Sequence, residues 1–251
     1  SSANLKDIEA RYELVKTMRA SILVLGPLLA KYGKARIALP GGCAIGTRPV
    51  NFHLDALKQL GAKINLKNGY IEASAKKLQG NKIKFDGVTV TGTENLMMAA
   101  TLAAGRTILT NVAKEPEIID LAEMLNSMGA KITGAGSDEI IIDGVESLHG
   151  SEYVIPADRI EAGTYLAAAA VTNGSITVEG INPTRLMKVI YKLNDAGAQI
   201  SYDDNSISIS MKKDRPRPVD VTTAPFPEFP TDMQAQFSVI NAISSGTSNI
   251  Y

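Results

Sequence analysis

The sequence predicts an α/β fold made of a repeated unit, and two series of regularly spaced glycines predict it. In the first series each glycine lies in a segment similar to Leu-Gly-Ala-Lys, and successive members are 68 residues apart: Gly61, Gly129 and Gly197. In the second series the spacings are 72, 69 and 72 residues: Gly33, Gly105, Gly174 and Gly246. Two interleaved series with nearly equal spacing indicate an internal repeat of about seventy residues.

Each glycine of the first series ends a helical pattern and precedes a predicted hairpin. Apolar residues recur at helical spacing before Gly61 and again, from Leu121 to Met128, before Gly129. Glycine suits a helix C-terminus because it adopts positive φ without strain. The predicted hairpins pair residues 63–66 with 70–73, 131–133 with 139–142, and 199–202 with 206–210. Turn-forming residues join the strands: Asn68-Gly69, Ser137-Asp138 and Asp204-Asn205.

Each glycine of the second series follows a helical pattern and precedes a predicted strand. These strands are residues 35–39, 107–109, 175–178 and 248–250. The unit is therefore helix, strand, helix, hairpin, repeated about three and a half times. Alternation of helices and strands predicts helices packed against sheets. A solenoid is the alternative at this period, but each unit holds more elements than solenoid repeats usually do, so we expect closed domains.

Composition bounds the class of protein and its partners. The chain has 251 residues with 45% hydrophobic content, enough for two globular domains. Its 26 basic and 26 acidic residues balance, so net charge favours neither nucleic acid nor an anionic membrane as a partner. The longest apolar stretches, residues 21–30 and 166–171, are too short to span a bilayer, and we expect a cytoplasmic protein. The chain lacks an initiator methionine and stops in a strand-like run, so we expect both ends to be cut.

A glycine-rich loop holds the single cysteine, Cys43, with Arg48 five residues further on. Gly41 and Gly42 allow a ligand to approach the backbone closely, and the planar guanidinium of Arg48 suits a phosphate or a carboxylate. Cys43 is either a reactive thiol or a small buried apolar residue, as lone cysteines often are.

The proline-rich segment 215–236 interrupts the repeat before a helix that starts near Thr231-Asp232. Two interpretations of this pair remain open. Either residue is the N-cap of the helix, since threonine and aspartate are common at that position, or the aspartate has a functional role.

Five segments together resemble the UDP-N-acetylglucosamine 1-carboxyvinyltransferases, a family of enolpyruvyl transferases. They are Pro40-Gly-Gly-Cys-Ala-Ile-Gly-Thr-Arg-Pro-Val, Phe229-Pro-Thr-Asp-Met-Gln-Ala-Gln, and residues 14–21, 114–117 and 158–161. The resemblance covers essentially the whole chain. It implies a two-domain inside-out α/β barrel built from repeated βαβαββ units around a cleft. Residues 1–156 would then form most of the first domain and residues 157–251 part of the second, with a hinge near 156–158.

The resemblance implies transfer of the enolpyruvyl group of phosphoenolpyruvate to the 3′-hydroxyl of UDP-N-acetylglucosamine, the first committed step of peptidoglycan precursor synthesis. No metal or organic cofactor is implied, and we expect a monomer with no nucleic-acid or membrane partner. The addition needs one acid and one base at the same reacting centre. In the family the loop cysteine is the acid, forms a covalent adduct and is the target of fosfomycin; here it is Cys43. The base would be Asp232.

Further residues take their roles from the same resemblance. Arg48 would bind the phosphate of phosphoenolpyruvate and Arg19 the diphosphate, as guanidinium groups do well. The uridine side would be lined by Pro49, Val50, Asn51, Phe52, Val88, Thr89 and Val90. Near the cleft or the hinge would lie Glu115, Arg159 and Glu161. His53 is expected to pack or cap. Two departures are Asn51, where many members have aspartate, and Gly87, where some have lysine.

Part of the family's machinery lies outside this chain. The N-terminal Lys-Asn pair and the later arginines that close on phosphoenolpyruvate are not among the 251 residues. We therefore expect the 251 residues alone not to turn over.

Three alternatives remain at the level of the sequence. A 3-phosphoshikimate 1-carboxyvinyltransferase-like enzyme shares the fold but lacks the cysteine loop. An RNA 3′-terminal phosphate cyclase needs a nucleotidyl-accepting histidine, and only His53 and His149 are available. In a non-catalytic α/β repeat scaffold, Cys43 and Asp232 would be ordinary packing and capping residues. Titration of the thiol separates the scaffold from the enzymes, since a scaffold cysteine should be unreactive.

Overall fold

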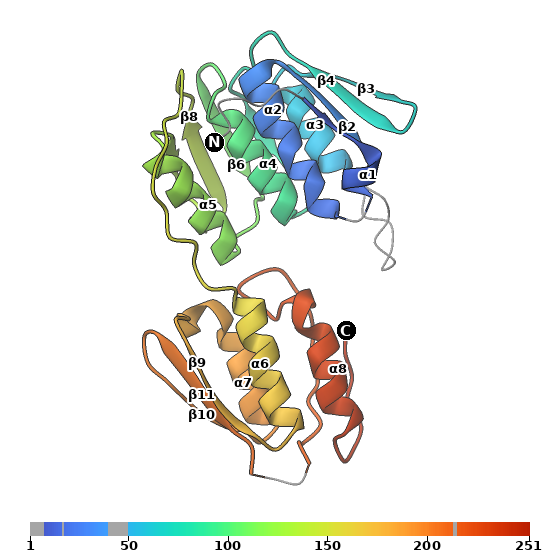
Figure 1. Cartoon of the computed structure of the whole chain (residues 1–251), viewed down its shortest axis with the longest axis vertical. Coiled ribbons are helices and arrows are strands. Elements are labelled where there is room, and N and C mark those ends of the chain that lie inside the picture. Colours follow the sequence, from blue (N-terminus) through green and yellow to red (C-terminus); the bar gives the residue numbers. More distant parts are fainter. Residues whose placement is uncertain (1–7, 17, 40–49, 213–214) are drawn as a thin grey trace. The chain divides into compact units, whose positions relative to one another are not determined.

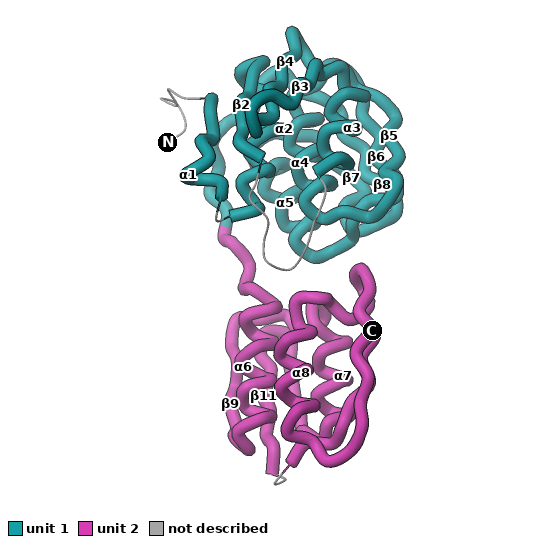
Figure 2. The backbone as a smooth tube through the Cα atoms, turned by 90° about the vertical axis from the view of Figure 1, so that its right-hand side faces the viewer, with its two compact units in different colours: residues 1–153 teal, residues 154–251 magenta. Residues whose placement is uncertain are grey.

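The computed structural model describes residues 8–16, 18–39, 50–212 and 215–251. The chain divides into two compact units, residues 1–153 and residues 154–251, coloured separately in Figure 2. The boundary predicted from the sequence, between residues 156 and 157, falls in the extended segment that follows Tyr153. Each unit has its own hydrophobic core.

Unit 1 begins with a four-stranded sheet whose strand order is β1-β2-β4-β3 (Figure 1). Strands β1 and β2 are parallel, and the other pairs are antiparallel. The elements in chain order are β1 (Glu9–Ala10), α1 (Tyr12–Val15), η2 (Arg19–Val24), α2 (Leu25–Tyr32), β2 (Lys34–Ala38), α3 (Asn51–Gln59), β3 (Lys63–Lys67) and β4 (Tyr70–Ser74).

The second half of unit 1 repeats this arrangement with the strand order β5-β6-β8-β7. Its elements are β5 (Lys82–Lys84), α4 (Val90–Ala100), β6 (Arg106–Thr110), α5 (Pro116–Ser127), β7 (Lys131–Thr133) and β8 (Glu139–Asp143). Again the first pair is parallel and the others are antiparallel. Unit 1 therefore contains two complete βαβαββ repeats, as the family resemblance implied, and each includes the helix, strand, helix and hairpin that the glycine spacing predicted.

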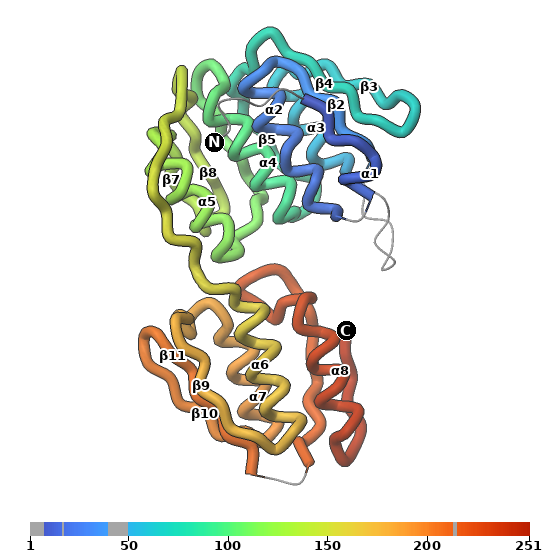
Figure 3. The backbone as a smooth tube through the Cα atoms, in the orientation of Figure 1, coloured from blue at the N-terminus to red at the C-terminus, as the bar shows by residue number. Residues whose placement is uncertain are grey.

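Unit 2 contains a third repeat that lacks the first parallel strand among the described residues (Figure 3). Its three-stranded antiparallel sheet has the order β10-β11-β9. The elements are α6 (Arg159–Val171), β9 (Ser175–Glu179), η3 (Pro183–Leu186), α7 (Met187–Asp195), β10 (Gln199–Tyr202) and β11 (Ser206–Ser210), followed by η4 (Thr231–Met233) and α8 (Gln234–Ala242). Strand β11 alternates serine with the buried Ile207 and Ile209, as a half-buried strand should.

A further half repeat closes unit 2. Val221 pairs with Ile250 in a parallel bridge on either side of η4 and α8, the same relation that β1 has to β2. The strand predicted at 248–250 is found in part. Ile250 forms the bridge, the N–H of Val221 donates to the carbonyl of Asn249, and the N–H of Tyr251 donates to the carbonyl of Val221, each at 2.9 Å.

The glycines of the first series end their helices with one shared motif. Gly61 has φ of 91°, its N–H donates to the carbonyl of Lys58, and the N–H of Ala62 donates to the carbonyl of Leu57 at 3.1 Å. These two bonds are those of a Schellman motif, which satisfies the last carbonyls of a helix. The corresponding bonds recur at Gly129 and Gly197. The first glycine series in the sequence therefore marks the same helix-ending motif in all three repeats.

In unit 1 the helices α2 and α4 lie side by side, and α3 and α5 also contact α4. Nearly all of α4 is buried, including Leu96 and Met97 at 0% exposure. Among the described residues, no helix has the length and apolar character that crossing a membrane requires.

Candidate functional site

The residues expected at the site fall into three groups by position. Cys43, Arg48 and Pro49 lie in segment 40–49, outside the described residues. Unit 1 holds Arg19, residues 50–52, residues 88–90 and Glu115. Unit 2 holds Arg159, Glu161 and Asp232.

In unit 1 the expected binding segments lie at the N-termini of two helices. Val50 is the N-cap of α3, and its carbonyl accepts from the N–H groups of His53 and Leu54. Thr89 is the N-cap of α4, where its Oγ1 accepts from the N–H of Gly92 at 3.2 Å. The N-terminus of a helix carries a partial positive charge and orphan N–H groups, so both ends favour an anionic ligand.

A buried polar network joins these two helices to the segment of Arg19. The side-chain amide of Asn95, on α4, contacts the backbone of Ile22 at 3.0 Å and of Gly26 at 2.7 Å. It also contacts Nδ1 of His53, on α3, at 3.0 Å. Asn95 is 0% exposed and His53 is 3% exposed. One asparagine therefore links η2 and α2 with α3.

Burial, together with the positive charge of Arg19 as the smaller cause, lowers the pKa of His53 to about 4. The imidazole is therefore neutral near pH 7. Its other nitrogen, Nε2, lies 3.3 Å from the hydroxyl of Thr91. His53 is thus a buried, hydrogen-bonded residue beside the charge of Arg19.

Phe52 fills the space next to Gly87, one of the two departures seen in the sequence. A Cβ placed on Gly87 would lie 3.2 Å from the Cζ of Phe52. A lysine at this position would require the Phe52 ring to shift, so glycine and the ring position are coupled. Asn51, the other departure, is exposed at the first residue of α3.

A cluster of acidic residues, of which only Glu115 was singled out from the sequence, lies between α4 and α5. Burial, together with the smaller effects of the charges of Glu117 and Glu115, raises the pKa of Glu94 to about 7. Glu115 is the N-cap of α5, and Glu117 lies in its first turn. The signal that could have identified the cluster is the single charged residue of segment 90–100, Glu94, together with the sequence Glu-Pro-Glu at 115–117.

In unit 2, α6 begins with a complete side-chain cap. Asp158 Oδ1 accepts from the N–H of Ile160 at 2.7 Å and from that of Glu161 at 3.1 Å. Arg159 is 6% exposed, and its guanidinium carbon lies 5.8 Å from the centre of the Phe226 ring. Glu161 is exposed in the first turn of α6.

Asp232 lies in the short helix η4, with its side chain exposed. The N-cap of η4 is Pro230, and neither η4 nor α8 has a side-chain cap. The interpretation of Thr231 or Asp232 as the N-cap is therefore wrong, because the chain enters the helix from a proline and turns without side-chain help. The turn is anchored instead by Met233, which is 0% exposed.

All 251 residues match the family model described as EPSP synthase (3-phosphoshikimate 1-carboxyvinyltransferase). The chain belongs to the EPSP synthase family. Two curated relatives are each named UDP-N-acetylglucosamine 1-carboxyvinyltransferase. The one from Hydrogenovibrio crunogenus is 54% identical over 249 residues, 99% of this chain and 60% of the relative. The one from Ruthia magnifica is 56% identical over 249 residues, 99% of this chain and 59% of the relative. The chain thus spans about 60% of the length of these relatives.

Solved structures confirm the fold class of this EPSP synthase family chain. The enolpyruvyl transferase NikO from Streptomyces tendae has a TM-score of 0.79 at 20% identity, over 98% of this chain and 60% of NikO. An EPSP synthase from Acinetobacter baumannii has a TM-score of 0.61 at 20% identity, over 92% of this chain and 54% of that enzyme. The fold is that of the enolpyruvyl transferases, an inside-out α/β barrel.

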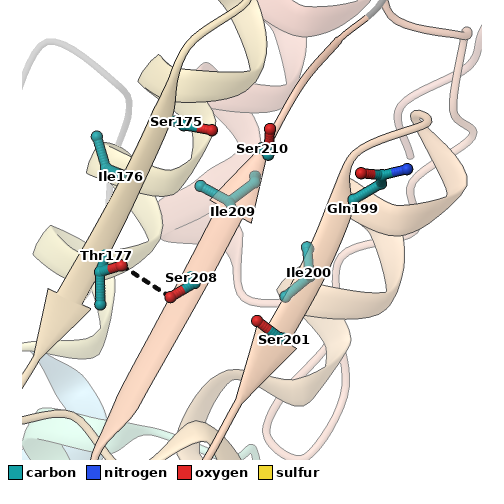
Figure 4. A pocket seen from close by; sticks show the side chains of 9 residues that line it. All are labelled: Ser175, Ile176, Thr177, Gln199, Ile200, Ser201, Ser208, Ile209 and Ser210. Carbon is teal, nitrogen blue, oxygen red and sulfur yellow. Dashed lines mark hydrogen bonds between the residues drawn. The ribbon is translucent and has the colours of Figure 1, made fainter.

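A depression on the sheet of unit 2 is lined by the residues drawn in Figure 4. It has a volume of about 450 Å³ on the sheet β10-β11-β9, where Thr177 Oγ1 and Ser208 Oγ are 2.7 Å apart. None of the residues predicted for the site lines it. Its hydroxyl groups offer no acid, base or cation. In the described part of the chain, no cluster of three or more His, Cys, Asp or Glu side chains is placed to hold a metal ion.

Proposed function

We propose that the protein carrying this chain transfers the enolpyruvyl group of phosphoenolpyruvate to the 3′-hydroxyl of UDP-N-acetylglucosamine and releases phosphate. The observation that carries the proposal is identity of 54% and 56%, over 99% of the chain, to two relatives named for this reaction. The reaction commits UDP-N-acetylglucosamine to peptidoglycan, so the protein would act in cell-wall formation, and hence in cell shape and division. It would act in the cytoplasm as a monomer.

Unit 1 supplies the groups suited to the UDP-sugar. The cation of Arg19 lies close enough to His53 to lower its pKa, and the N-termini of α3 and α4 present orphan N–H groups. A diphosphate carries the negative charge that this combination favours. Val50, Asn51 and Phe52, with Pro49, Val88, Thr89 and Val90, would line the uridine side. Arg48 would bind the phosphate of phosphoenolpyruvate.

Cys43 and Asp232 would move the protons. In the addition step the sugar O3′ forms a bond to C2 of phosphoenolpyruvate while Cys43 delivers a proton to C3. The hydroxyl proton passes to Asp232, whose exposed carboxylate makes no capping bond. In the elimination step C3 returns a proton to the Cys43 thiolate and the C2–O bond to phosphate breaks, which restores the double bond. The leaving phosphate takes the proton held by Asp232. This sequence needs one acid and one base, and no metal or organic cofactor.

The family model is named for the corresponding reaction on shikimate 3-phosphate, which makes that substrate the main alternative. The Pro-Gly-Gly-Cys loop favours the UDP-sugar. A direct test measures phosphate release from phosphoenolpyruvate with each acceptor, using the protein that carries this chain. We expect release with UDP-N-acetylglucosamine and none with shikimate 3-phosphate. The reverse result would overturn the proposal.

Fosfomycin separates the two roles open to Cys43. This epoxide has a phosphonate beside an electrophilic carbon, and Arg48 would hold the phosphonate while the thiolate opens the ring. Cys43→Asp should keep activity within about tenfold, because a carboxyl group still delivers a proton, but it should abolish inactivation. Peptide mapping of the wild-type adduct should identify Cys43. An adduct elsewhere, or an unchanged inactivation rate in the variant, would contradict this role.

A further inference from the structure

The orientation of the Asn95 amide is fixed by its backbone neighbours. The N–H of Gly26 is a donor, so it must face the amide oxygen, and it does so at 2.7 Å. The carbonyl of Ile22 is an acceptor, so it must face the amide nitrogen, and it does so at 3.0 Å. The second hydrogen of that nitrogen then points at Nδ1 of His53, 3.0 Å away.

This orientation determines the tautomer of His53. Because the amide nitrogen of Asn95 can only donate, Nδ1 of His53 must accept and carries no proton. The proton of the neutral imidazole is therefore on Nε2, which lies 3.3 Å from Thr91 Oγ1 and donates to it. The direction of donation runs from Asn95 through His53 to Thr91. Thr91 is the second residue of α4, close to the candidate segment 88–90.

The close approach of α2 to α4 makes this arrangement unusually tight. A Cβ added to Gly26 would collide with both the main-chain oxygen and the side-chain oxygen of Asn95. Only glycine lets the backbone of α2 reach the amide. Burying an amide and an imidazole costs free energy, and their hydrogen bonds do little more than offset that cost. An apolar pair of similar shape would therefore stabilise the fold equally well. The polar pair gives one defined arrangement of the three segments.

We propose that Asn95 is a positioning residue for the UDP-sugar half of the site and acts through His53. By holding His53 as the neutral tautomer with the proton on Nε2, it keeps the segment of Arg19 and the N-termini of α3 and α4 in register. The identity of the ligand rests on the proposed function, but the tautomer does not. A neutral ring is suited to this place because the charged group beside it is Arg19, and a second cation would repel it. Glu94, the neighbour of Asn95 on α4, interacts with the carboxylates at the start of α5.

The tautomer can be measured directly by ¹⁵N NMR of the histidine side chains in the protein that carries this chain. A His149→Gln variant separates the signal of His149 from that of His53. We expect His53 to be neutral at pH 7, with a protonated Nε2 and an unprotonated Nδ1. Asn95→Asp replaces the donor by an acceptor, so the proton should move to Nδ1 or the ring should become charged. A wild-type His53 protonated on Nδ1 would overturn the assignment.

The positioning role is tested by steady-state kinetics, with Asn126 as a control that makes a similar pair of backbone contacts but is exposed. Asn126, on α5, also bridges a backbone donor and acceptor, since it contacts the N–H of Ile132 at 2.8 Å and the carbonyl of Ile132 at 2.9 Å. Asn95→Asp should raise the KM for UDP-N-acetylglucosamine by about 10-fold to 100-fold, more than it lowers kcat. Asn126→Asp should leave that KM within about twofold.

The outcomes separate the two proposals. If the wild type binds UDP-N-acetylglucosamine and both asparagine variants change KM equally, Asn95 has only a structural role and the inference is wrong. If the wild type does not bind the nucleotide sugar, the proposed function is wrong, whatever the NMR shows. Asn95→Leu adds a control for folding. It should keep unit 1 folded, yet raise KM as Asn95→Asp does, because no donor then fixes His53.

Discussion

Unit 1 and unit 2 hold their candidate residues by different means. In unit 1 the segments of Arg19, Val50 and Thr89 are tied together by the buried side chains of His53 and Asn95. In unit 2 Asp232 lies on an exposed helical turn that has no side-chain cap. Its position is set by the apolar anchor Met233 and the backbone of η4. The binding half is therefore organised by polar side chains, and the proposed base by the backbone.

This difference shows how one repeated backbone can support two roles, the proposed binding of the UDP-sugar in unit 1 and the proposed base in unit 2. Helices α4 and α6 occupy the same place in the βαβαββ unit, each before the second strand. The core of α4 includes the polar Thr93 and Asn95 in the middle of the helix, whereas in α6 the buried residues after Arg159, its first residue, are Leu166 and small residues. The repeat determines the backbone, and the buried faces of equivalent helices determine what that backbone can hold.

The largest change in the free energy of unfolding is expected at the close contact between Gly26 and Asn95 in unit 1. Gly26→Ala should lower the free energy of unfolding of unit 1 by about 3 kcal/mol, since the added methyl group collides with both oxygens of Asn95. Urea unfolding measures this change. Gly150→Ala is the control, because a Cβ there meets nothing within 4 Å, and it should change stability by no more than about 0.5 kcal/mol. Equal changes in the free energy of unfolding would show that the close contact between Gly26 and Asn95 does not contribute to the stability of unit 1.

In unit 2 the corresponding test measures turnover and not stability. Asp232→Asn should reduce turnover by roughly 10²-fold, about 2.7 kcal/mol, because it removes the proposed base. Stability should be unchanged, since the side chain caps neither helix. Affinity for the UDP-sugar should stay within a few fold.

Asp195→Asn, at the end of α7, is the matched control for an exposed aspartate and should leave turnover unaffected. Near-normal turnover of Asp232→Asn would assign the base elsewhere.

The acidic cluster of unit 1 predicts a pH dependence of stability. The pKa of Glu94 is raised from 4.5 to about 7, so the folded state retains a proton that the unfolded state has lost. The stability from this group is full below pH 4.5 and disappears as the pH rises through 7. Glu94→Gln should therefore raise the free energy of unfolding at pH 8 by about 2 kcal/mol, less than the full linkage value because Glu94 is not completely buried.

The measurement is urea unfolding at pH 5 and at pH 8, with the exposed Glu152→Gln as control. Glu94→Gln should reduce the difference in the free energy of unfolding between pH 5 and pH 8, whereas Glu152→Gln should leave that difference unchanged. A pH dependence that is unchanged in Glu94→Gln would show that the cluster is fully solvated.

The sequence predicted the backbone better than the buried contacts. All six hairpin strands and the helix ends at Gly61, Gly129 and Gly197 were found within one residue, because glycine conformation and alternation are local properties. The strand predicted at 248–250 is present only as a bridge at Ile250, since its pairing with Val221 depends on a partner far away in the sequence. The network of Asn95 could not be predicted at all. It joins residues 69 and 73 positions apart, and nothing in the local pattern distinguishes Asn95 from a solvated asparagine.

The smallest effect concerns the two helix starts of unit 2. Asp158→Ala should lower the free energy of unfolding of unit 2 by about 1 kcal/mol, because Asp158 Oδ1 accepts from two N–H groups at the start of α6. Thr231→Ala should change it by less than about 0.5 kcal/mol, since the helix that follows has no side-chain cap. Thermal unfolding of both variants measures the pair. If Thr231→Ala costs as much as Asp158→Ala, a cap exists at η4, and the position of Asp232 depends on side chains after all. If only Asp158→Ala is destabilising, the backbone alone positions the proposed base, as the contrast with unit 1 requires.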